Sequence, residues 1–244
     1  MINRMPLRGR PQPALTRLAA LAPLDEAAWS SLVVATARPQ PVRSKHEIAV
    51  EGDVISEPRL VVSGWAARVR QLADGRRQLL SFLLPGDLIG LCDQPCPVAT
   101  SSVVALTGVT ICAAPAATVS PALAQAYALS RALEEAHLLS HIARLGRLTA
   151  QERIGDLLLE LLERLHLAGL ADETSFDFPL TQEMLGDALG LTSVHVNRMV
   201  QLSRRDGDID WRQGRLTIRD PARLARNVGR VPVQVSSLAI APRT

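Results

Sequence analysis

The stretch that decides the fold is LTQEMLGDALGLTSVHVNRMVQLSR, which covers residues 180–204. The pattern predicts a helix that begins at Thr181, and Gly190 can take the left-handed conformation that ends it. Thr192 or Ser193 then caps a second helix. Two short helices joined by a tight turn that contains glycine predict a helix-turn-helix.

The second of these helices has one face that can read DNA. Its members are Ser193, Val194, Asn197, Arg198 and Gln201, with His195 beside them. Side chains of Asn, Gln and Arg form hydrogen bonds to base edges or phosphates, and a valine can contact a thymine methyl group. We expect Thr192, His195 and the helix start at Thr181 and Gln182 to lie near phosphates.

A β-hairpin follows the two helices. Residues 209–211 and 215–218 flank the tip Arg212-Gln213-Gly214, which predicts a wing that places Arg212 and Arg215 near the DNA backbone. Residues 198–230 hold nine arginines and four aspartates, a local net charge of +5 in a chain whose formal net charge is +3. This concentration favours a polyanionic partner. A plain pair of packed helices with a solvated arginine surface is the alternative.

The first half of the chain has a different pattern. The 244 residues are 47% hydrophobic, enough for one large or two modest domains. Between residues 39 and 115, short apolar runs alternate with turn residues about every eight to twelve positions, which predicts an antiparallel β-sandwich or roll. Asp74-Gly75 is expected to close a hairpin with a two-residue turn of positive φ.

Helical spacing of apolar residues leads into this β domain, whose predicted extent is residues 14–120. Residues 1–13 carry three arginines, three prolines and no acidic residue, and are predicted to form a flexible arm.

A long helix is predicted over residues 121–148, because small and apolar residues recur there at a spacing of three and four. A second apolar set widens the stripe, and consists of Ala128, Ala132, Leu139 and Ile142. We infer dimerisation through this helix, and an ordinary core helix of a monomer is the alternative. Thr149-Ala150-Gln151-Glu152 is a capping box that begins a separate helical domain, residues 149–230, before a tail over 231–244.

The order of these parts resembles the Crp/Fnr family of bacterial transcription regulators over roughly residues 15–226. The resemblance rests on Glu51-Gly52-Asp53, Ser63-Gly64, LLPGDLIGL at 83–91 and the stretch over 180–200. It implies an α+β fold with an N-terminal antiparallel β-roll, a long dimerisation helix and a C-terminal winged helix-turn-helix. It also implies a homodimer that binds a palindromic operator in double-stranded DNA, and RNA polymerase as a partner.

The chain departs from the family at the ligand site. In members that bind cAMP, a Gly-Glu-Leu turn and a later Arg-Ser pair hold the ribose and the phosphate. Here the turn reads Gly90-Leu91-Cys92 and the later segment, residues 98–102, reads VATSS. A buried phosphate without its cation has a large desolvation cost, so we predict that the roll does not bind cAMP. The signal sensed stays open.

The recognition helix departs as well. Family members commonly have Glu at the position of Val194, where it accepts a hydrogen bond from cytosine, and Arg at the position of Arg198. Because the glutamate is replaced and the arginine is kept, we expect a half-site that differs from the usual family operator.

Three cysteines, an odd number in a chain too large to need disulfides, suit a reducing compartment. An iron–sulfur cluster, which oxygen-sensing members carry, needs about four thiolates, and the first 91 residues contain no cysteine. Cys92 and Cys96 could form a redox pair, or a soft-metal site with Cys112. We favour three partly buried residues without a chemical role.

His137 and His141 lie one helical turn apart and could chelate a metal, but no third ligand is evident, so a packed or solvated face is favoured. No cofactor is predicted. No apolar run reaches the roughly 18 residues that span a bilayer, and we expect a cytoplasmic protein. No catalytic constellation stands out, so we predict no enzyme. The alternative function is a ligand-binding regulatory module that acts through protein contacts.

Overall fold

Two helices, α1 (Pro13–Leu21) and α2 (Glu26–Thr36), lead into the β-roll. The structure, a computed structural model, describes residues 12–92 and 94–235. The predicted arm lies outside the described residues except at its end, where Pro13 is already the first residue of α1, because its fixed φ suits that position. Asp25 caps α2 by accepting a hydrogen bond from the Ala28 N–H at 2.8 Å.

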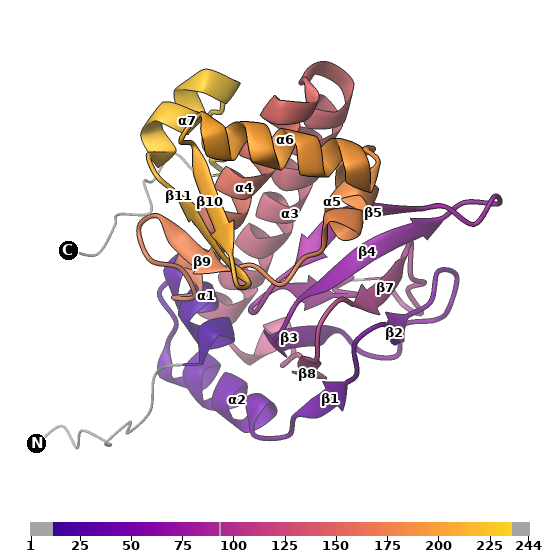
Figure 1. Cartoon of the computed structure of the whole chain (residues 1–244). Coiled ribbons are helices and arrows are strands. Elements are labelled where there is room, and N and C mark those ends of the chain that lie inside the picture. The colour runs from indigo at the N-terminus through magenta and orange to yellow at the C-terminus, as the bar shows by residue number, and fades with distance from the viewer. Residues whose placement is uncertain (1–11, 93, 236–244) are drawn as a thin grey trace, which may run out of the picture.

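Two four-stranded antiparallel sheets form the predicted roll (Figure 1). One sheet has the order β1-β8-β3-β6 and the other the order β2-β7-β4-β5. Their strands are β1 (Gln40–Val42), β2 (Glu47–Ala49), β3 (Arg59–Ser63), β4 (Ala66–Gln71), β5 (Arg77–Leu83), β6 (Leu88–Ile89), β7 (Ser102–Ala105) and β8 (Val109–Ala113). Val61, Leu83, Val103 and Ile111 belong to the apolar core of the roll.

The turn of the β4–β5 hairpin differs from the expected one. The Leu72 N–H donates to the Arg76 carbonyl at 2.8 Å, so three residues form the turn and the prediction of two was wrong. Gly75 has a φ of 84°, but Asp74 does not share a positive φ. The Asp74 carboxylate instead accepts from the N–H of Arg76 at 3.0 Å, which holds the residue in an ordinary turn conformation.

A short 3-10 helix, η1 (Ala117–Val119), precedes the predicted long helix, α3 (Pro121–Arg147). The Ser120 hydroxyl caps α3 by accepting from the Leu123 N–H at 3.1 Å. One face of α3 packs on α1 and on the roll. On the opposite side the apolar side chains of Leu139 and Ile142 are 61% and 67% exposed.

The capping box confirms the next helix boundary, because Thr149 and Glu152 exchange the expected hydrogen bonds. Helix α4 (Ala150–Leu167) runs back antiparallel to α3, and Gly169, which follows its C-cap, has a φ of 69°. The remaining elements are β9 (Ser175–Asp177), α5 (Gln182–Leu189), α6 (Ser193–Arg205), β10 (Ile209–Arg212), β11 (Arg215–Ile218) and α7 (Pro221–Val228). The strands form a sheet of order β10-β11-β9.

One apolar core continues from the roll into the helical part. It includes a row of aromatic rings in which Trp65 of the roll packs edge-on against Phe178, with ring centroids 6.2 Å apart. Phe178 in turn packs against Trp211 of the hairpin at 5.1 Å. Buried leucines of α4 lie in the same core. The roll and the helical part therefore share buried apolar surface.

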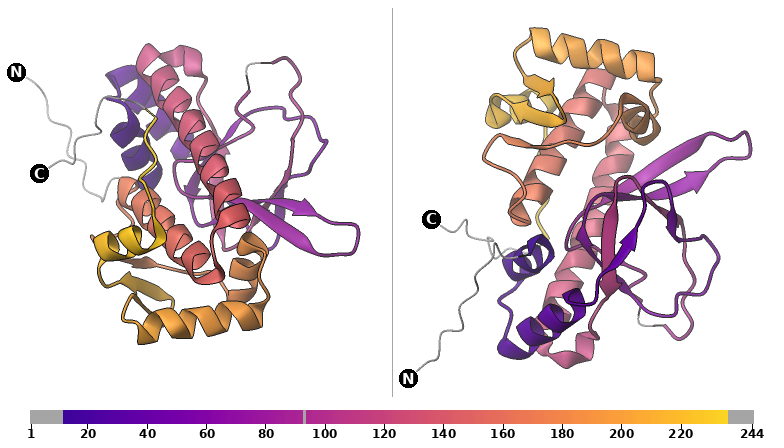
Figure 2. Two further views of the ribbon diagram at one scale, coloured as in Figure 1. Left: turned by 90° about the horizontal axis from the view of Figure 1, so that it is seen from above. Right: turned by 60° about the horizontal axis from the view of Figure 1, so that its bottom comes forward.

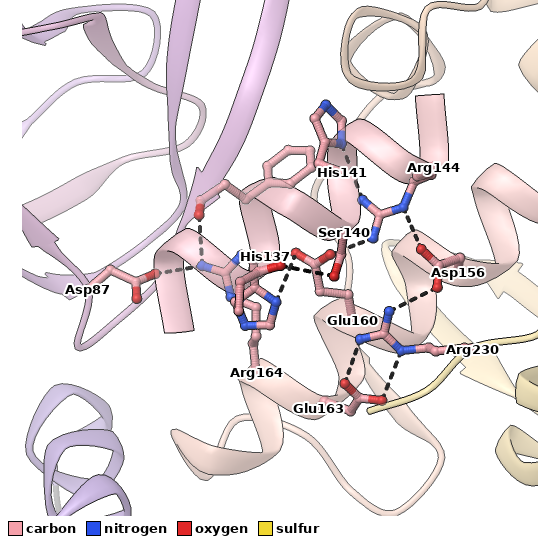
Figure 3. Close-up of polar contacts among 12 residues, drawn as sticks. Asp87, His137, Ser140, His141, Arg144, Asp156, Glu160, Glu163, Arg164 and Arg230 are labelled. Carbon is pink, nitrogen blue, oxygen red and sulfur yellow. Dashed lines mark hydrogen bonds and ion pairs between the residues drawn. The ribbon is translucent and has the colours of Figure 1, made fainter. Parts of the chain in front are cut away.

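A chain of buried charges of alternating sign also joins the two parts (Figure 3). Its members, which we call the charge chain, are in order Arg17, Asp87, Arg164, Glu160, Arg144, Asp156 and Arg230. Neighbouring nitrogen and oxygen atoms lie between 2.5 and 3.3 Å apart. The charge chain connects α1, the roll, α3, α4 and the segment after α7, so it links the roll to the helical part of the molecule.

Burial and neighbouring charges set the protonation of Glu160 and of two histidines beside the charge chain. Burial alone would raise the pKa of Glu160, but the guanidinium groups of Arg144 and Arg164 lower it to about 2. Burial lowers the pKa of His137 to about 4, and the positive charge of Arg164 acts in the same direction. Burial likewise lowers the pKa of His141. The carboxylate is therefore ionised at neutral pH, and both imidazoles are neutral.

Candidate nucleic-acid interface

The helix-turn-helix forms as predicted. Gly190 ends α5 in the left-handed conformation, with a φ of 64°. Gly186 is required by close packing, because a Cβ atom at this position would lie 2.4 Å from the Leu191 carbonyl oxygen. The hydroxyls of Thr181 and Thr192 both act as N-caps, accepting from backbone N–H groups at 3.2 Å. The caps fix the starts of both helices, which are the positions where phosphates bind.

Helix α6 lies along one end of the molecule with its outer side uncovered, and the β10–β11 hairpin lies next to it (Figures 1 and 2). The structure brings the predicted base-reading residues together on this outer face: Ser193, Val194, Asn197, Arg198 and Gln201 are all exposed. His195 is half-buried beside them. The opposite face of α6 is anchored in the core by Val196 and Val200. We call the five exposed residues the reading face.

Polar contacts order part of the reading face. The Gln182 amide Nε2 donates to the Asn197 Oδ1 at 3.3 Å, so α5 contacts α6 across the turn. An Arg198 guanidinium nitrogen lies 3.4 Å from His195 Nε2. Within the described residues, no carboxylate forms an ion pair with Arg198. Its positive charge is therefore available to an external acceptor.

The predicted wing forms as a tight hairpin between β10 and β11. Its two turn residues, Gln213 and Gly214, have φ values of 50° and 75°, as a two-residue hairpin turn requires. Arg212, which was predicted to belong to the tip, is instead the last residue of β10 and pairs with Arg215. The Gly214 carbonyl accepts from the Phe178 N–H at 2.6 Å. This bond ties the tip of the hairpin to the chain just before α5, so the wing and the helix-turn-helix are held together.

The two wing arginines meet carboxylates of their own chain. Arg212 pairs with Asp210 at 2.9 Å. Arg215 pairs with Asp177 at 3.2 Å and also with Asp172. These pairs offset the charge that the sequence pattern assigned to a bound DNA backbone. The acidic partners of Arg215 lie about 40 residues earlier in the chain, on and before β9. The sequence pattern of the hairpin therefore could not predict these ion pairs.

Ion pairs within the protein therefore neutralise several of the arginines that give residues 198–230 their net charge of +5. Arg223 pairs with Asp208 at 3.0 Å, and Arg230 is drawn into the charge chain. In the part of the chain that the structure describes, arginines of this region without a carboxylate partner are Arg198, Arg205, Arg219 and Arg226. Two of them, Arg198 and Arg205, belong to α6, so half of these unpaired arginines lie on the recognition helix.

The helix-turn-helix is also attached to the roll. Arg77 of β5 pairs with Asp187 of α5 at 2.6 Å. The neighbouring Gln78 amide donates to the Ala188 carbonyl at 3.0 Å. Sequence analysis missed both contacts, because each joins residues 110 positions apart. Through them the protruding β4–β5 hairpin positions α5, and α5 positions the reading face.

A cavity of about 1010 Å³ lies between the roll and α3. Its wall includes Gly90, Leu91 and Cys92 and the segment from Val98 to Ser101, the stretches in which the family pattern would place ligand-binding residues. The guanidinium of Arg68, which also lines the cavity, is 2.6 Å from a carboxylate oxygen of Glu134 on α3. Its charge is therefore offset within the protein.

The three cysteines differ in exposure. Cys92 and Cys96 are exposed, so the expectation that all three thiols are partly buried was wrong for these two, which lie in the loop after β6. Cys112 is buried, and burial raises the pKa of its thiol. Among the described residues no three His, Cys, Asp or Glu side chains are placed to hold a metal ion.

In that same part of the chain, no helix has the length and apolar content needed to cross a bilayer.

Family models match both halves of the chain. The model described as the Crp-like helix-turn-helix domain matches residues 152–227, and the cyclic nucleotide-binding domain matches residues 39–126.

Relatives and solved structures agree with these matches. The transcriptional activator protein FnrL of Cereibacter sphaeroides is 31% identical over 188 residues, which is 73% of this chain and 75% of that protein. The nitrogen fixation regulation protein FixK of Azorhizobium caulinodans is 32% identical over 212 residues, 83% of this chain and 84% of that protein. The solved structure of FixK2 from Bradyrhizobium japonicum is similar with a TM-score of 0.68 and 28% identity, and covers 80% of this chain and 98% of that one.

Proposed function

This chain belongs to the Crp/Fnr family of bacterial transcription regulators, and from that premise we propose that it acts as a homodimer that binds a palindromic operator in double-stranded DNA. The observation that carries the proposal is the reading face of α6, which is uncovered and polar and includes Arg198 without a carboxylate partner in the described part of the chain. Such a face suits the major groove of DNA.

The homodimer is supported by the uncovered apolar side of α3. Leu139 and Ile142 are more than half exposed, and Ala128 is exposed on the same side. An apolar stripe of this kind on a long helix is stabilised when a second copy covers it. Two copies would present two recognition helices to successive major grooves about 34 Å apart, which is the spacing that a palindrome requires.

The roll does not bind cAMP in this proposal. The two segments that would supply the carboxylate and the guanidinium line the cavity with Leu91, Cys92 and Thr100 instead. Among the described residues, the arginines that line the cavity are Arg68, which already pairs with Glu134, and Arg131 of α3. Calorimetric titration with cAMP is expected to show no binding.

The proposed partners follow from the function. RNA polymerase is the partner through which a regulator of this family acts on transcription, and the cytoplasm is the proposed location. The chain is a regulator without catalytic residues in this proposal.

The experiment that tests DNA binding uses the full chain and random 30-base-pair duplexes. We expect binding at low salt that weakens as salt rises, because bound phosphates release counterions. Selection from the random pool should enrich one palindrome, and Arg198→Ala should lose base preference. Arg43→Ala, an exposed arginine of the roll, is the matched control and should keep it. Absence of binding at low salt would contradict the proposal.

The dimer is tested by light scattering. The double variant Leu139→Glu with Ile142→Glu is expected to be monomeric and to bind the selected palindrome far more weakly. Val34→Glu, which places the same charge on an exposed valine of α2, is expected to stay dimeric. A wild-type chain that is monomeric in solution and on DNA would overturn the homodimer.

A further inference from the structure

The reading face has one apolar member, which lies near the start of α6. Val194 is 78% exposed, in the first turn of α6, and its neighbours on that face are polar. An exposed β-branched side chain contributes nothing to the core here, and valine is a poorer helix former than alanine. Its chemistry fits a partner that offers an apolar group within a polar groove.

The major groove offers one such group, the C5-methyl of thymine. A valine cannot accept the hydrogen bond that the exocyclic amine of cytosine donates. Residues 193–205, which make up α6, include no Asp or Glu, so no carboxylate of this helix can accept it either. At the base opposite Val194, thymine is therefore favoured over cytosine.

Asn197 lies one helical turn after Val194 and is held by a neighbouring helix. Its Oδ1 accepts from Gln182 Nε2 at 3.3 Å, which orients the amide of Asn197. An oxygen has a second lone pair, so Oδ1 can also accept from the N6 amine of adenine while Nδ2 donates to N7. The hydrogen bond from Gln182 thus orients the Asn197 amide for two hydrogen bonds to adenine.

We infer that α6 reads a thymine with Val194 and an adenine with Asn197, and that Gln182 is the residue that positions the Asn197 amide. This inference rests on the proposed function and names the base content of its operator. Three residues of helix advance about 4.5 Å, and one base pair about 3.4 Å, so the two bases lie one or two steps apart in each half-site.

The thymine contact is tested on the palindrome that wild-type protein selects from random duplexes. Deoxyuridine, which lacks only the methyl group, is placed at each thymine of the half-site in turn. At one position the affinity should fall about fourfold, as expected for one buried methyl-sized group. Val194→Ala should make the protein insensitive to that replacement, and Val194→Glu should select cytosine there. A palindrome with no methyl-sensitive thymine would overturn the role of Val194.

The adenine contact is tested with 7-deazaadenine, which removes the N7 acceptor. At the adenine read by Asn197, affinity should fall tenfold or more, and Asn197→Ala should abolish this sensitivity. Gln182→Ala should reduce the preference for adenine at that position and leave the methyl effect at the thymine unchanged. An equal loss at both positions would show that Gln182 only supports the helix, and would overturn its positioning role.

The outcome separates this inference from the proposed function. A protein that selects a palindrome without a methyl-sensitive thymine or an N7-sensitive adenine keeps its function and loses this inference. A protein that binds no duplex loses both.

Discussion

Arg144 links Glu160 to Asp156 within the charge chain and is only 1% exposed. Its guanidinium contacts Asp156 and Glu160 at the same time, at 2.6 and 2.5 Å. A planar group with several fixed donors can serve two carboxylates in this way, and a lysine ammonium fits such a site less well. The residue therefore balances two buried negative charges.

Arg144→Met removes this balance. We expect the free energy of unfolding to fall by about 3–5 kcal/mol, because two carboxylates would stay buried with fewer partners. Urea denaturation at one protein concentration measures the effect. Arg147→Met, an exposed arginine in the last turn of the same helix, is the control and should change stability by less than about 0.5 kcal/mol. Equal effects of the two variants would contradict the role of Arg144.

His137 makes the stability depend on pH. Its pKa is about 4 in the folded protein, lowered mainly by burial from 6.5, so the unfolded chain takes up the proton first as pH falls. The contribution of His137 is complete above about pH 6.5 and is lost as pH falls toward 4. Between pH 7.5 and 5.5 the free energy of unfolding should drop by about 1 kcal/mol from this group.

His137→Gln removes the titrating group and should reduce that drop. Urea denaturation of wild type and variant at the two pH values measures it. His141, whose pKa is also lowered by burial, stays in the variant and accounts for part of the remaining loss. The same pH dependence in both proteins would count against the assignment to His137.

At the scale of the elements, two helical glycines have opposite roles. A Cβ atom at Gly186 would lie 2.4 Å from a backbone oxygen of the turn, whereas a Cβ atom at Gly146 in α3 would meet nothing within 4 Å. Gly186→Ala should therefore lower stability by about 1–3 kcal/mol and weaken DNA binding, because the angle between α5 and α6 must change. Gly146→Ala should raise stability by about 0.5–1 kcal/mol. Thermal unfolding of both variants measures these changes in stability. An increase in stability for Gly186→Ala would contradict the close packing at this position.

Elements whose signals are local were predictable from the sequence. The capping box at Thr149 and the left-handed Gly190 each depend on residues within a few positions of one another, and both are confirmed. The wing hairpin also forms, but its turn is Gln213-Gly214, and Arg212, which was assigned to the tip, is the last residue of β10. The turn at Asp74-Gly75 was mispredicted for a local reason as well. The same dipeptide suits two-residue and three-residue turns, and the longer turn has the hydrogen bond that the Arg76 N–H donates to the Asp74 carboxylate.

At the scale of the whole molecule, the spacing of residues in the sequence did not predict the contacts between distant parts of the chain. The exposed reading face could be predicted because it belongs to one helix, but the ion partners of Arg215 and the contact between Arg77 and Asp187 depend on the tertiary fold. The charge chain joins Arg17 to residues as far along the chain as Arg230. No periodicity relates such residues, so only the packed structure reveals which arginines are left for DNA.

The shared core predicts cooperative unfolding of roll and helical part. Trp29 lies in α2 and Trp211 in the wing, and Trp65 packs at the junction between the two parts. In Trp211→Phe the remaining tryptophans, Trp29 and Trp65, report on the roll and the helices that lead into it. In Trp29→Phe the remaining tryptophans, Trp65 and Trp211, report on the junction and the wing. We expect the fluorescence transition of each variant to coincide with its own loss of helical circular dichroism. Two separated transitions would show that the parts unfold independently.

The charge chain also has a consequence for how this protein can evolve. Replacing one member strands a buried charge, whereas replacing linked members together by apolar residues of similar volume can be neutral or stabilising. The seven positions are therefore expected to change in compensated groups, and a lineage that loses one is expected to lose its partners as well. The joint between roll and helix-turn-helix is inherited as a unit, while the reading face, whose residues are exposed, is free to diversify toward new operators one substitution at a time.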